Sequence, residues 1–322
     1  MSLSKISVII PTYNQCHFLI KAINSVFSTQ YANIEIIIID DASTDGTYAT
    51  ACTLADKYKG HIQVLQHPDK KNHGEGASRN LGIRASQGKY ICFLDSDDYF
   101  LPNRFETCVP MLDTNPSIDG IFEDTRSIFL KGSEHRIGII RPVVSFNCDD
   151  YKQILEKIIH KGKHWHTNAI TLRKSILTQV GGFSEDSEQF RGCEDLVLWL
   201  KLACIAKLVR GNDEPVAVYV NHSANNSSSD LISQIWSPLS AYLEAFLWSK
   251  SNKIYKPKHN ILKDAVIRKL FYASDCLRQA QRPDIALTLL LKVFLHIPSL
   301  AVEKLYWGNI IFALKEYFFS KL

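Results

Sequence analysis

The chain has 322 residues, of which 46% are hydrophobic and 22% charged, a composition that argues against a disordered protein. Its 37 basic and 33 acidic residues leave a net charge of +4, too small an excess to indicate a nucleic-acid-binding protein. No run of about 20 uninterrupted apolar residues occurs, so the sequence does not predict a transmembrane helix.

The N-terminus and the cysteines bear on the compartment. Residues 1–5 lead directly into a strand-like segment, and we do not expect them to form a signal peptide. The eight cysteines are scattered without a C-x-x-C pair, which favours reduced thiols over a disulfide framework or a zinc site. We therefore expect a cytoplasmic protein of one large or two modest domains.

Strand-like and helix-like segments alternate over residues 1–115. Apolar, β-branched residues predict four strands, at residues 6–10, 34–39, 62–65 and 90–94. Helical spacing and capping residues predict three helices between them: one at residues 16–28, one that follows the cap and turn residues 43–46 and runs to residue 58, and one at residues 75–87. This alternation implies a largely parallel, doubly wound sheet of the α/β class.

The remainder of the chain is first irregular and then helical. We expect strands at residues 118–122 and 137–144 and a helix at residues 151–160. Segments 169–172 and 216–220 are expected to pair at a sheet edge. An Asn- and Ser-rich loop is expected at residues 221–230. The last part, residues 231–322, has apolar helical faces, with expected interruptions at Pro238, Pro257, Pro283 and Pro298.

Polar segments follow the predicted strands. They are residues 12–14, 40–41, 67–79 and 95–98. Because the carboxyl ends of parallel strands share one edge of a sheet, we expect these segments to converge although they lie far apart in sequence. Open parallel sheets bind their ligands at this edge, so the sequence predicts a ligand site there.

Asp95-Ser96-Asp97-Asp98 is the most distinctive of these segments. Three carboxylates within four residues repel one another unless a cation or hydrogen-bond donors compensate. Mg²⁺ commonly combines one or two carboxylates with phosphate oxygens, so the motif is typical of a metal and phosphate site. The alternative is an Asp-rich turn that caps a helix after Pro102.

Two other segments suggest contacts with a nucleotide. A carboxylate of Asp40-Asp41 can accept from ribose hydroxyls or a base N–H, and its alternative is a turn and helix N-cap. Residues 74–80 (GEGASRN) have part of a dinucleotide-binding fingerprint. They lack its last glycine and follow the third predicted strand, which excludes a nicotinamide or flavin Rossmann site. Arg79 could meet a phosphate or lie at the surface.

Four motifs occur in a fixed order in the first part of the chain. They are residues 7–14 (SVIIPTYN), 39–47 (IDDASTDGT), 76–82 (GASRNLG) and 93–98 (FLDSDD). With them the chain resembles the family 2 glycosyltransferases, which have the GT-A fold. The resemblance covers residues 5–115 closely and extends to residue 225. It implies a nucleotide-sugar donor, most favourably a UDP-sugar, a Mn²⁺ or Mg²⁺ cofactor held by a DxD motif, and inversion at the anomeric carbon.

The resemblance also implies roles for individual residues. The implied donor-binding residues are Pro11, Thr12, Tyr13, Asp41, Arg79, Asp95 and Ser96. Asp41 would accept from the base, and Asp95 would lie by the ribose or the sugar. Asp97 would ligate the metal that bridges the diphosphate, whereas Asp98 is left between a metal contact and a helix cap.

A second acidic pair follows the segment 181–183 (GGF). Asp195 matches the family's catalytic base, and Glu194 is the next candidate. Such a base accepts the proton of the acceptor hydroxyl and must lie within hydrogen-bond reach of it. The alternative is that both carboxylates only favour the N-terminus of a helix at residues 196–206.

Two further residues are weaker candidates. His222 matches a position where several relatives place a metal- or diphosphate-binding histidine, and its alternative is a solvated loop residue. Trp165 could stack on the face of an acceptor sugar, and its alternative is core packing. The H-x-H pattern around Trp165 is by itself a weak metal signal.

The C-terminal residues 287–322 interleave apolar and aromatic residues with lysines. Such amphipathic helices can lie on the inner face of an anionic membrane, which would suit a lipid-linked acceptor. The alternative is packing on the catalytic domain or on a partner subunit of a homo-oligomer. We expect a GT-A domain at residues 1–225, with a nucleotide-sugar half at 1–115 and an acceptor half at 116–225, and a helical region at 226–322.

The expected activity is transfer of one sugar to a saccharide or lipid-linked saccharide in cell-surface polysaccharide synthesis, with no nucleic-acid partner. A sugar nucleotidyltransferase is one alternative, but that class usually has a Gly-rich loop with Arg or Lys where this chain has residues 11–14. A non-catalytic saccharide-binding or scaffolding protein is the other. The presence of Asp41, Asp97 and Asp195 argues against it.

Overall fold

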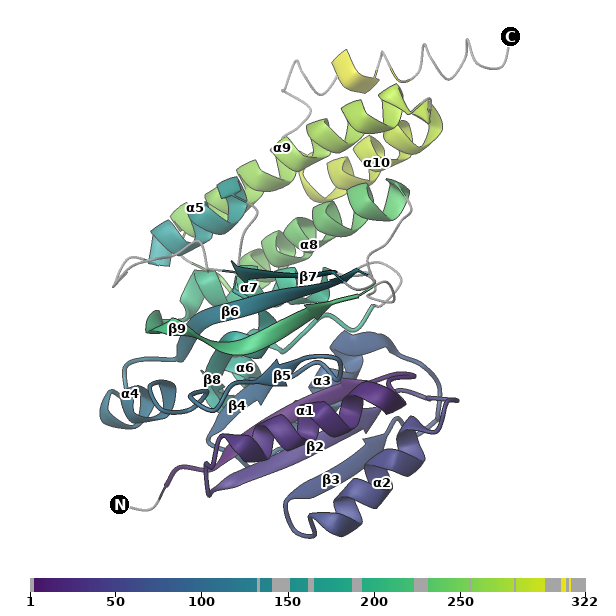
Figure 1. Ribbon diagram of the computed structural model, residues 1–322. Coiled ribbons are helices and arrows are strands. Elements are labelled where there is room, and N and C mark those ends of the chain that lie inside the picture. Colours follow the sequence, from purple (N-terminus) through teal and green to yellow (C-terminus); the bar gives the residue numbers. More distant parts are fainter. Residues whose placement is uncertain are drawn as a thin grey trace. The chain divides into compact units, whose positions relative to one another are not determined.

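The computed structural model forms two compact units (Figure 1). One contains Met1–Ser187 and Leu202–Asn226, and the other contains Glu188–Lys201 and Ser227–Leu322. The structure describes residues 3–131, 134–140, 151–161, 165–186, 193–222, 231–254, 256–280, 282–298, 308–310 and 313.

The first unit begins with the predicted alternation of strands and helices. Its strands are β1 (Ile6–Thr12), β2 (Ile34–Asp40), β3 (Ile62–Gln66) and β4 (Tyr90–Phe93). Its helices are α1 (Cys16–Ser28), α2 (Thr47–Lys57) and α3 (Gly74–Ala85). The four strands pair in parallel in the order β3-β2-β1-β4. The predicted α/β class and parallel sheet are thus confirmed.

The two faces of this sheet are covered by different helices, as Figure 1 shows. Even-numbered residues of β1, such as Val8 and Ile10, share one apolar cluster with Ile23 of α1 and Leu54 of α2. On the opposite face Gly82 brings α3 against Ile9, so closely that a methyl group at Gly82 would collide with the isoleucine side chain. This alternation of side chains between the faces is what the strand period of two requires.

After β4 the sheet becomes mixed. The further strands are β5 (Tyr99–Phe100), β6 (Gly120–Lys131), β7 (Glu134–Ile140), β8 (Ile170–Arg173) and β9 (Leu208–Asn221). The sheet order is β3-β2-β1-β4-β8-β6-β9-β5, with β7 paired to β6. The β4–β8, β6–β8, β6–β7 and β5–β9 pairs are antiparallel, and the β6–β9 pair is parallel.

One pairing that we expected from the sequence is wrong. Segments 169–172 and 216–220 do form strands, in β8 and β9, but β6 lies between them, so they do not pair with each other. The expected strand at residues 137–144 is present as far as Ile140, within β7, and its last four residues lie outside the described part. Short helices complete the unit: α4 (Cys108–Thr114), α5 (Tyr151–Lys161), the 3-10 helix η1 (Thr167–Ala169) and α6 (Lys174–Val180).

The second unit is helical, as the sequence predicts for the C-terminal region. Its helices are α8 (Leu231–Ser251), α9 (Lys256–Gln279) and α10 (Pro283–His296). The helix α7 (Glu194–Ile205) begins in this unit and ends in the first. The prediction that Pro238 interrupts a helix is wrong, because α8 continues through it. Pro257 and Pro283 lie in the first turns of α9 and α10, where a missing N–H is tolerated.

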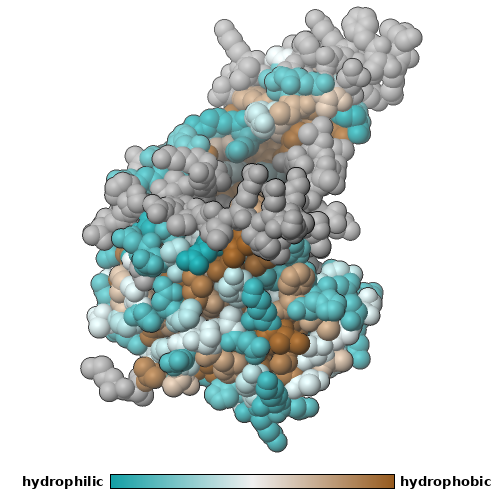
Figure 2. Space-filling model, in the orientation of Figure 1, coloured by the Kyte–Doolittle hydropathy of each residue, from teal (hydrophilic) through white to brown (hydrophobic). Residues whose placement is uncertain are grey.

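The helices of the described part include none that is both long and apolar enough to cross a membrane. Figure 2 shows one face, on which hydrophilic residues cover much of the described surface and hydrophobic residues lie between them. In α10 the side chains of Leu291 and Leu295 are exposed. The predicted contact of the C-terminal helices with a membrane stays a prediction.

Candidate active site

The ends of β1 and β2 are held together by their following loops. The backbone N–H of Asn14 donates to the Ser43 hydroxyl at 2.9 Å, and the Asn14 carboxamide oxygen accepts from the Thr44 N–H at 2.8 Å. Asn14 adopts a φ of +53°, a conformation that asparagine tolerates better than most residues. The predicted convergence of these two polar segments is therefore present.

Four of the implied donor-binding residues lie at these strand ends. Pro11, Thr12 and Asp41 are buried, and Tyr13 is exposed. The hydroxyl of Thr12 and one carboxylate oxygen of Asp40 are buried without a hydrogen-bond partner. Tyr13 thus offers the most accessible side chain for a nucleoside at this edge.

Asp41 performs the capping role that the sequence left open. Its two carboxylate oxygens accept from the backbone N–H groups of His73 and Gly74, each at 2.8 Å, where α3 begins. A carboxylate at a helix N-terminus also interacts favourably with the helix dipole. Contact of Asp41 with a nucleotide base stays a prediction.

Arg79 is not a surface residue and does not point its charge at open solvent. Its guanidinium is 2% exposed and donates to Asp95 at 2.7 Å and to Glu75 at 2.8 Å. Burial acts to raise the pKa of Asp95, but the Arg79 charge outweighs it and holds that pKa below its ordinary value. Arg79 therefore orients Asp95, and a direct contact of Arg79 with a donor stays a prediction.

The aspartate turn (residues 95–98) presents Asp97 beside a histidine from another strand. The imidazole Nε2 of His222, just after β9, lies 3.1 Å from a carboxylate oxygen of Asp97. Phe18 of α1 stacks on the His222 ring, with centroids 4.9 Å apart and planes 8° from parallel. Burial and the Asp95 carboxylate raise the pKa of Asp97, and His222 partly offsets this. Two candidate metal ligands, 125 residues apart, thus meet.

Asp98 is buried and does not cap a helix, because the strand β5 follows it. One of its oxygens accepts from the backbone N–H of Val220 at 2.9 Å, and the other accepts from the carboxamide of Asn168 at 2.8 Å. Burial, Asp95 and Asp97 raise the pKa of Asp98 well above its ordinary value. Ser96, in the same turn, is also buried.

Trp165 does not offer a face to an acceptor sugar, and this prediction needs correction. The indole is 1% exposed and stacks on Phe122 at a centroid distance of 5.5 Å. Burial of a large aromatic side chain stabilises a hydrophobic core, so Trp165 follows the alternative of core packing. The preceding histidine of the H-x-H pattern lies outside the described residues.

Glu194 and Asp195 lie in the first turn of α7, where acidic side chains are favourable. The indole N–H of Trp199 lies 3.4 Å from a carboxylate oxygen of Asp195, one helical turn along. In the same unit Cys193 is partly buried, and burial together with Asp195 and Glu194 raises the pKa of its thiol to about 12. A neutral thiol beside the acidic pair makes Cys193 a packing residue.

Two further side chains lie near the aspartate turn: His166, which the sequence offered only within the weak H-x-H pattern, and Tyr219, which it did not indicate. The rings of His166 and Tyr219 lie 4.8 Å apart, and the charge of His166 lowers the pKa of Asp95. Burial and the Asp98, Asp97 and Asp95 carboxylates raise the pKa of Tyr219. They come from a 3-10 turn and from β9, and no local pattern relates segments so distant.

The segment 181–183 (GGF) is fixed to α3. Asn80 accepts from the Phe183 N–H and donates to its carbonyl oxygen, each at 2.9 Å. The Phe183 ring also contacts the Arg79 guanidinium, 5.3 Å from the ring centroid. The segment 181–183 is therefore linked to α3 through Asn80 and contacts Arg79, the partner of Asp95.

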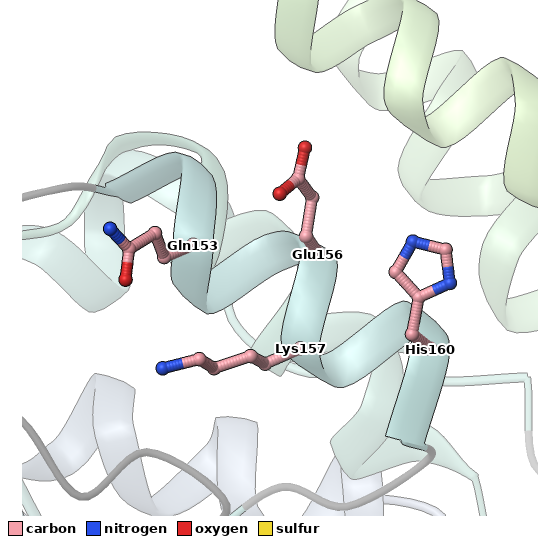
Figure 3. A pocket seen from close by; sticks show the side chains of 4 residues that line it. All are labelled: Gln153, Glu156, Lys157 and His160. Atoms are coloured by element: carbon pink, nitrogen blue, oxygen red, sulfur yellow. The ribbon is translucent and has the colours of Figure 1, made fainter.

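A separate surface hollow lies over α5 and is lined by Gln153, Glu156, Lys157 and His160 (Figure 3). The four side chains project from one helix in different directions. None of them belongs to the aspartate turn or to the other predicted site residues, so this hollow does not define the candidate site.

Asp97 and His222 fit a divalent cation whose remaining coordination positions are filled by a bound ligand. Among the residues that the structure describes, no group of three or more His, Cys, Asp or Glu side chains is arranged to hold a metal ion. Asp97 and His222 alone offer an oxygen and a nitrogen. Mg²⁺ is usually bound through one or two carboxylates plus phosphate oxygens, so an incomplete protein site is what a diphosphate-bridging ion requires.

A family comparison decides the classification. The sequence model described as Glycosyl transferase family 2 matches residues 7–177, which is more than half of the chain. The chain belongs to glycosyl transferase family 2. The matched region contains the whole parallel sheet, the aspartate turn and η1, so the predicted family is confirmed.

Similar proteins agree with this assignment. An uncharacterized glycosyltransferase of Rickettsia felis is 43% identical over 207 residues, which are 62% of this chain and 30% of that protein. One from Nostoc sp. is 29% identical over 228 residues, 70% of this chain and 67% of that protein. The chain spans less than a third of the length of several Rickettsia relatives that it matches.

Solved structures show the same fold. S. aureus TarS 1–349 in complex with UDP-GlcNAc has a TM-score of 0.69 at 20% identity, with coverage of 89% of this chain and 79% of that one. The mannosyltransferase PcManGT from Pyrobaculum calidifontis, in complex with GDP-Man and Mn²⁺, has a TM-score of 0.56 at 16% identity. The match covers 98% of this chain and 85% of the PcManGT chain. The GT-A-type fold with a helical extension is therefore confirmed.

Proposed function

We propose that the chain is a divalent-metal-dependent, inverting glycosyltransferase that moves one sugar from a nucleoside diphosphate, most favourably UDP, to a saccharide or lipid-linked saccharide acceptor. The observation that carries the proposal is the meeting of Asp97 and His222 beside the Arg79-bound Asp95, at the carboxyl end of β4. Mn²⁺ or Mg²⁺ bound there would neutralise charge on the departing diphosphate. Assembly of cell-surface polysaccharide is the proposed setting.

The donor would lie across the ends of β1, β2 and β4. Tyr13 supplies an exposed ring beside the β1 end, where a base can stack. Asp95, ionised and held by Arg79, is placed to accept from ribose or sugar hydroxyls. UDP is favoured because TarS, which shares the fold, was crystallised with UDP-GlcNAc. PcManGT binds GDP-Man with Mn²⁺, so GDP is the next nucleotide to test.

Asp195 would act as the general base. Its carboxylate would accept the proton of the acceptor hydroxyl as the hydroxyl oxygen attacks the anomeric carbon. The Trp199 indole N–H would hold one of its oxygens. Glu194 is the alternative base in the same helical turn.

The proposal is tested by thermal unfolding of the full chain with UDP, GDP, CDP or dTDP, each with Mn²⁺ or with EDTA. A ligand that binds the native state raises the unfolding midpoint by mass action. We expect one diphosphate, UDP first, to raise it with Mn²⁺ and not with EDTA. Release of that diphosphate from its nucleotide sugars then identifies the donor.

Two results would contradict the proposal. If no diphosphate raises the midpoint while a saccharide does so without nucleotide, the chain is a saccharide-binding protein on this fold. If a nucleoside triphosphate and a sugar phosphate yield pyrophosphate, it is a sugar nucleotidyltransferase.

A further inference from the structure

Asp98 takes part in the sheet through its side chain. After the aspartate turn the chain enters β5, where Tyr99 pairs with Val218 and Phe100 with Ala217 of β9. The Val220 N–H donates to the Asp98 carboxylate at 2.9 Å. The side chain of Asp98 thus extends the ladder and fixes the end of β9, two residues before His222.

The second oxygen of Asp98 is held from a third segment. It accepts from the Asn168 carboxamide N–H at 2.8 Å, and the Asn168 carboxamide oxygen accepts from the Thr125 hydroxyl at 2.9 Å. The exposed fractions of Asp98, Asn168 and Thr125 are 1%, 0% and 1%. Both carboxylate oxygens of Asp98 therefore accept a hydrogen bond, and Asn168 presents its amide nitrogen to Asp98 and its oxygen to Thr125.

Asn168 is itself held rigidly by a buried cation. The Arg104 Nε–H donates to the Asn168 carbonyl oxygen at 3.1 Å, and Arg104 also contacts Glu123 at 3.2 Å and Thr171 at 3.0 Å. Arg104 is fully buried and Glu123 nearly so. Buried polar networks of this kind are costly when any member loses its partner, so the position of the Asn168 amide is well determined.

We infer that Asp98 and Asn168 are positioning residues that hold Asp97 and His222 in register as a pair of metal ligands. Asp98 directly follows Asp97 in the chain, and its carboxylate accepts from the backbone of β9 two residues before His222. One side chain is therefore linked to both candidate ligands. Outer contacts of this kind commonly change metal affinity by about 10- to 100-fold. The inference rests on the proposed function, because it requires that Asp97 and His222 bind a cation.

A reciprocal exchange tests it. In Asp98→Asn two amide groups face each other, and in Asn168→Asp two carboxylates do, so each single variant loses the hydrogen bond. The double variant Asp98→Asn/Asn168→Asp restores it with donor and acceptor exchanged. The Asn side chain at 98 can still accept from Val220, and the Asp side chain at 168 can still accept from Thr125.

The measurement is the dissociation constant for Mn²⁺, followed by the electron paramagnetic resonance of free Mn²⁺ with UDP at a fixed concentration. It is made well below the unfolding midpoint of each variant. We expect both single variants to bind Mn²⁺ at least about tenfold more weakly, and the double variant to recover most of the affinity. Thr125→Val, which removes only the hydroxyl donor to Asn168, should weaken binding less than either.

Other outcomes are distinguishable. If Asp98 acts only through its charge, Asn168→Asp strengthens Mn²⁺ binding while Asp98→Asn weakens it, and the inference fails. If the single variants melt earlier but bind Mn²⁺ as the wild type does, the contact is merely structural and the inference fails as well. If neither single variant folds, a folded double variant decides: wild-type affinity supports the inference, and lost affinity overturns it. If the wild type binds no Mn²⁺ with UDP, the metal-dependent part of the proposed function fails and takes this inference with it.

Discussion

At the scale of single residues, the aspartate turn contains carboxylates whose pKa values are shifted in opposite directions. Arg79 contacts Asp95 directly and lowers its pKa, whereas burial and the Asp95 carboxylate raise the pKa of Asp97 more than the neighbouring His222 imidazole lowers it. The carboxylates of the turn are all partly or wholly buried, so the difference between their pKa shifts follows from their partners. Asp95 is therefore ionised without a metal, and Asp97 is the carboxylate whose charge a bound cation would stabilise.

Replacement of Asp97 tests that assignment. Asp97→Asn keeps the shape of the side chain and removes its charge, so we expect the Mn²⁺-dependent rise of the unfolding midpoint with UDP to disappear. Affinity for UDP in Mn²⁺ should fall at least about tenfold. Asp213→Asn serves as the matched control, because the Asp213 side chain is 92% exposed. An unchanged response in Asp97→Asn would exclude this residue as a metal ligand.

The base is tested separately from the metal site. Asp195→Asn should leave Mn²⁺-dependent UDP binding intact, since the side chain lies on α7 and has no assigned donor contact. Transfer should fall by about 10²- to 10⁴-fold, the usual contribution of a general base. Release of UDP in the presence of acceptor measures it, with Glu194→Gln for comparison. Near-normal transfer by Asp195→Asn, with loss in Glu194→Gln, would move the role to Glu194.

At the scale of elements, two neighbouring glycines and Asn80 hold the segment 181–183 against α3. Gly181 and Gly182 both have positive φ, of +81° and +71°. A methyl group at Gly181 would meet open space, whereas one at Gly182 would collide with the Asn80 carboxamide oxygen. That oxygen is the acceptor for the Phe183 N–H, so the collision would break the link.

These neighbouring glycines give a matched pair of variants. Gly181→Ala should cost about 1 kcal/mol, from backbone strain alone. Gly182→Ala has the same strain plus the collision, and we expect a total loss of about 2–4 kcal/mol. Urea unfolding measures both. Equal losses in the two variants would show that the Asn80 contact does not stabilise the segment.

At the scale of the whole molecule, buried titratable groups make stability depend on pH. His67 is buried next to Ser78, at 3.0 Å, and burial lowers its pKa although Asp41 lies near. A histidine with a lowered folded-state pKa is favoured in its neutral form. Its contribution to stability is fully present above the ordinary histidine pKa of about 6.5 and is lost as the pH falls below it.

Comparison with His67→Asn isolates this contribution. Between about pH 7 and pH 5 the wild type should lose stability relative to the variant. Only in the wild type does unfolding expose this imidazole and allow it to take up a proton, which favours the unfolded state as the pH falls. Urea midpoints across that range measure the difference, and His17→Asn, at an exposed histidine, is the control. Parallel curves for wild type and His67→Asn would show that His67 does not titrate differently on unfolding.

The second compact unit is not one continuous stretch of chain. Glu188–Lys201 belongs to the same compact unit as the C-terminal helices, and Leu202–Asn226 belongs to the same unit as the sheet. Within the second unit Lys201 pairs with Glu244 of α8 at 2.7 Å, and Val197 packs on Ala241. The helical extension thus holds the part of α7 that carries Glu194 and Asp195.

The sequence by itself determined the parallel half of the fold. Each strand there is rich in apolar, mostly β-branched residues, each helix has its own spacing, and the polar residues that end the strands lie beside them in sequence. The aspartate turn and the family motifs are equally local, and they were sufficient to predict the family and the residues at the carboxyl edge.

Only the tertiary structure decided the second half of the sheet and the surroundings of the aspartate turn. Strand order after β4 depends on pairings between distant segments, so β6 could separate β8 from β9 without any local sign. Burial of Trp165 and the contacts of Asp98 with Asn168 and Val220 depend on the same pairings. Local sequence patterns determine which residues form strands and turns, but long-range packing determines which side chains meet.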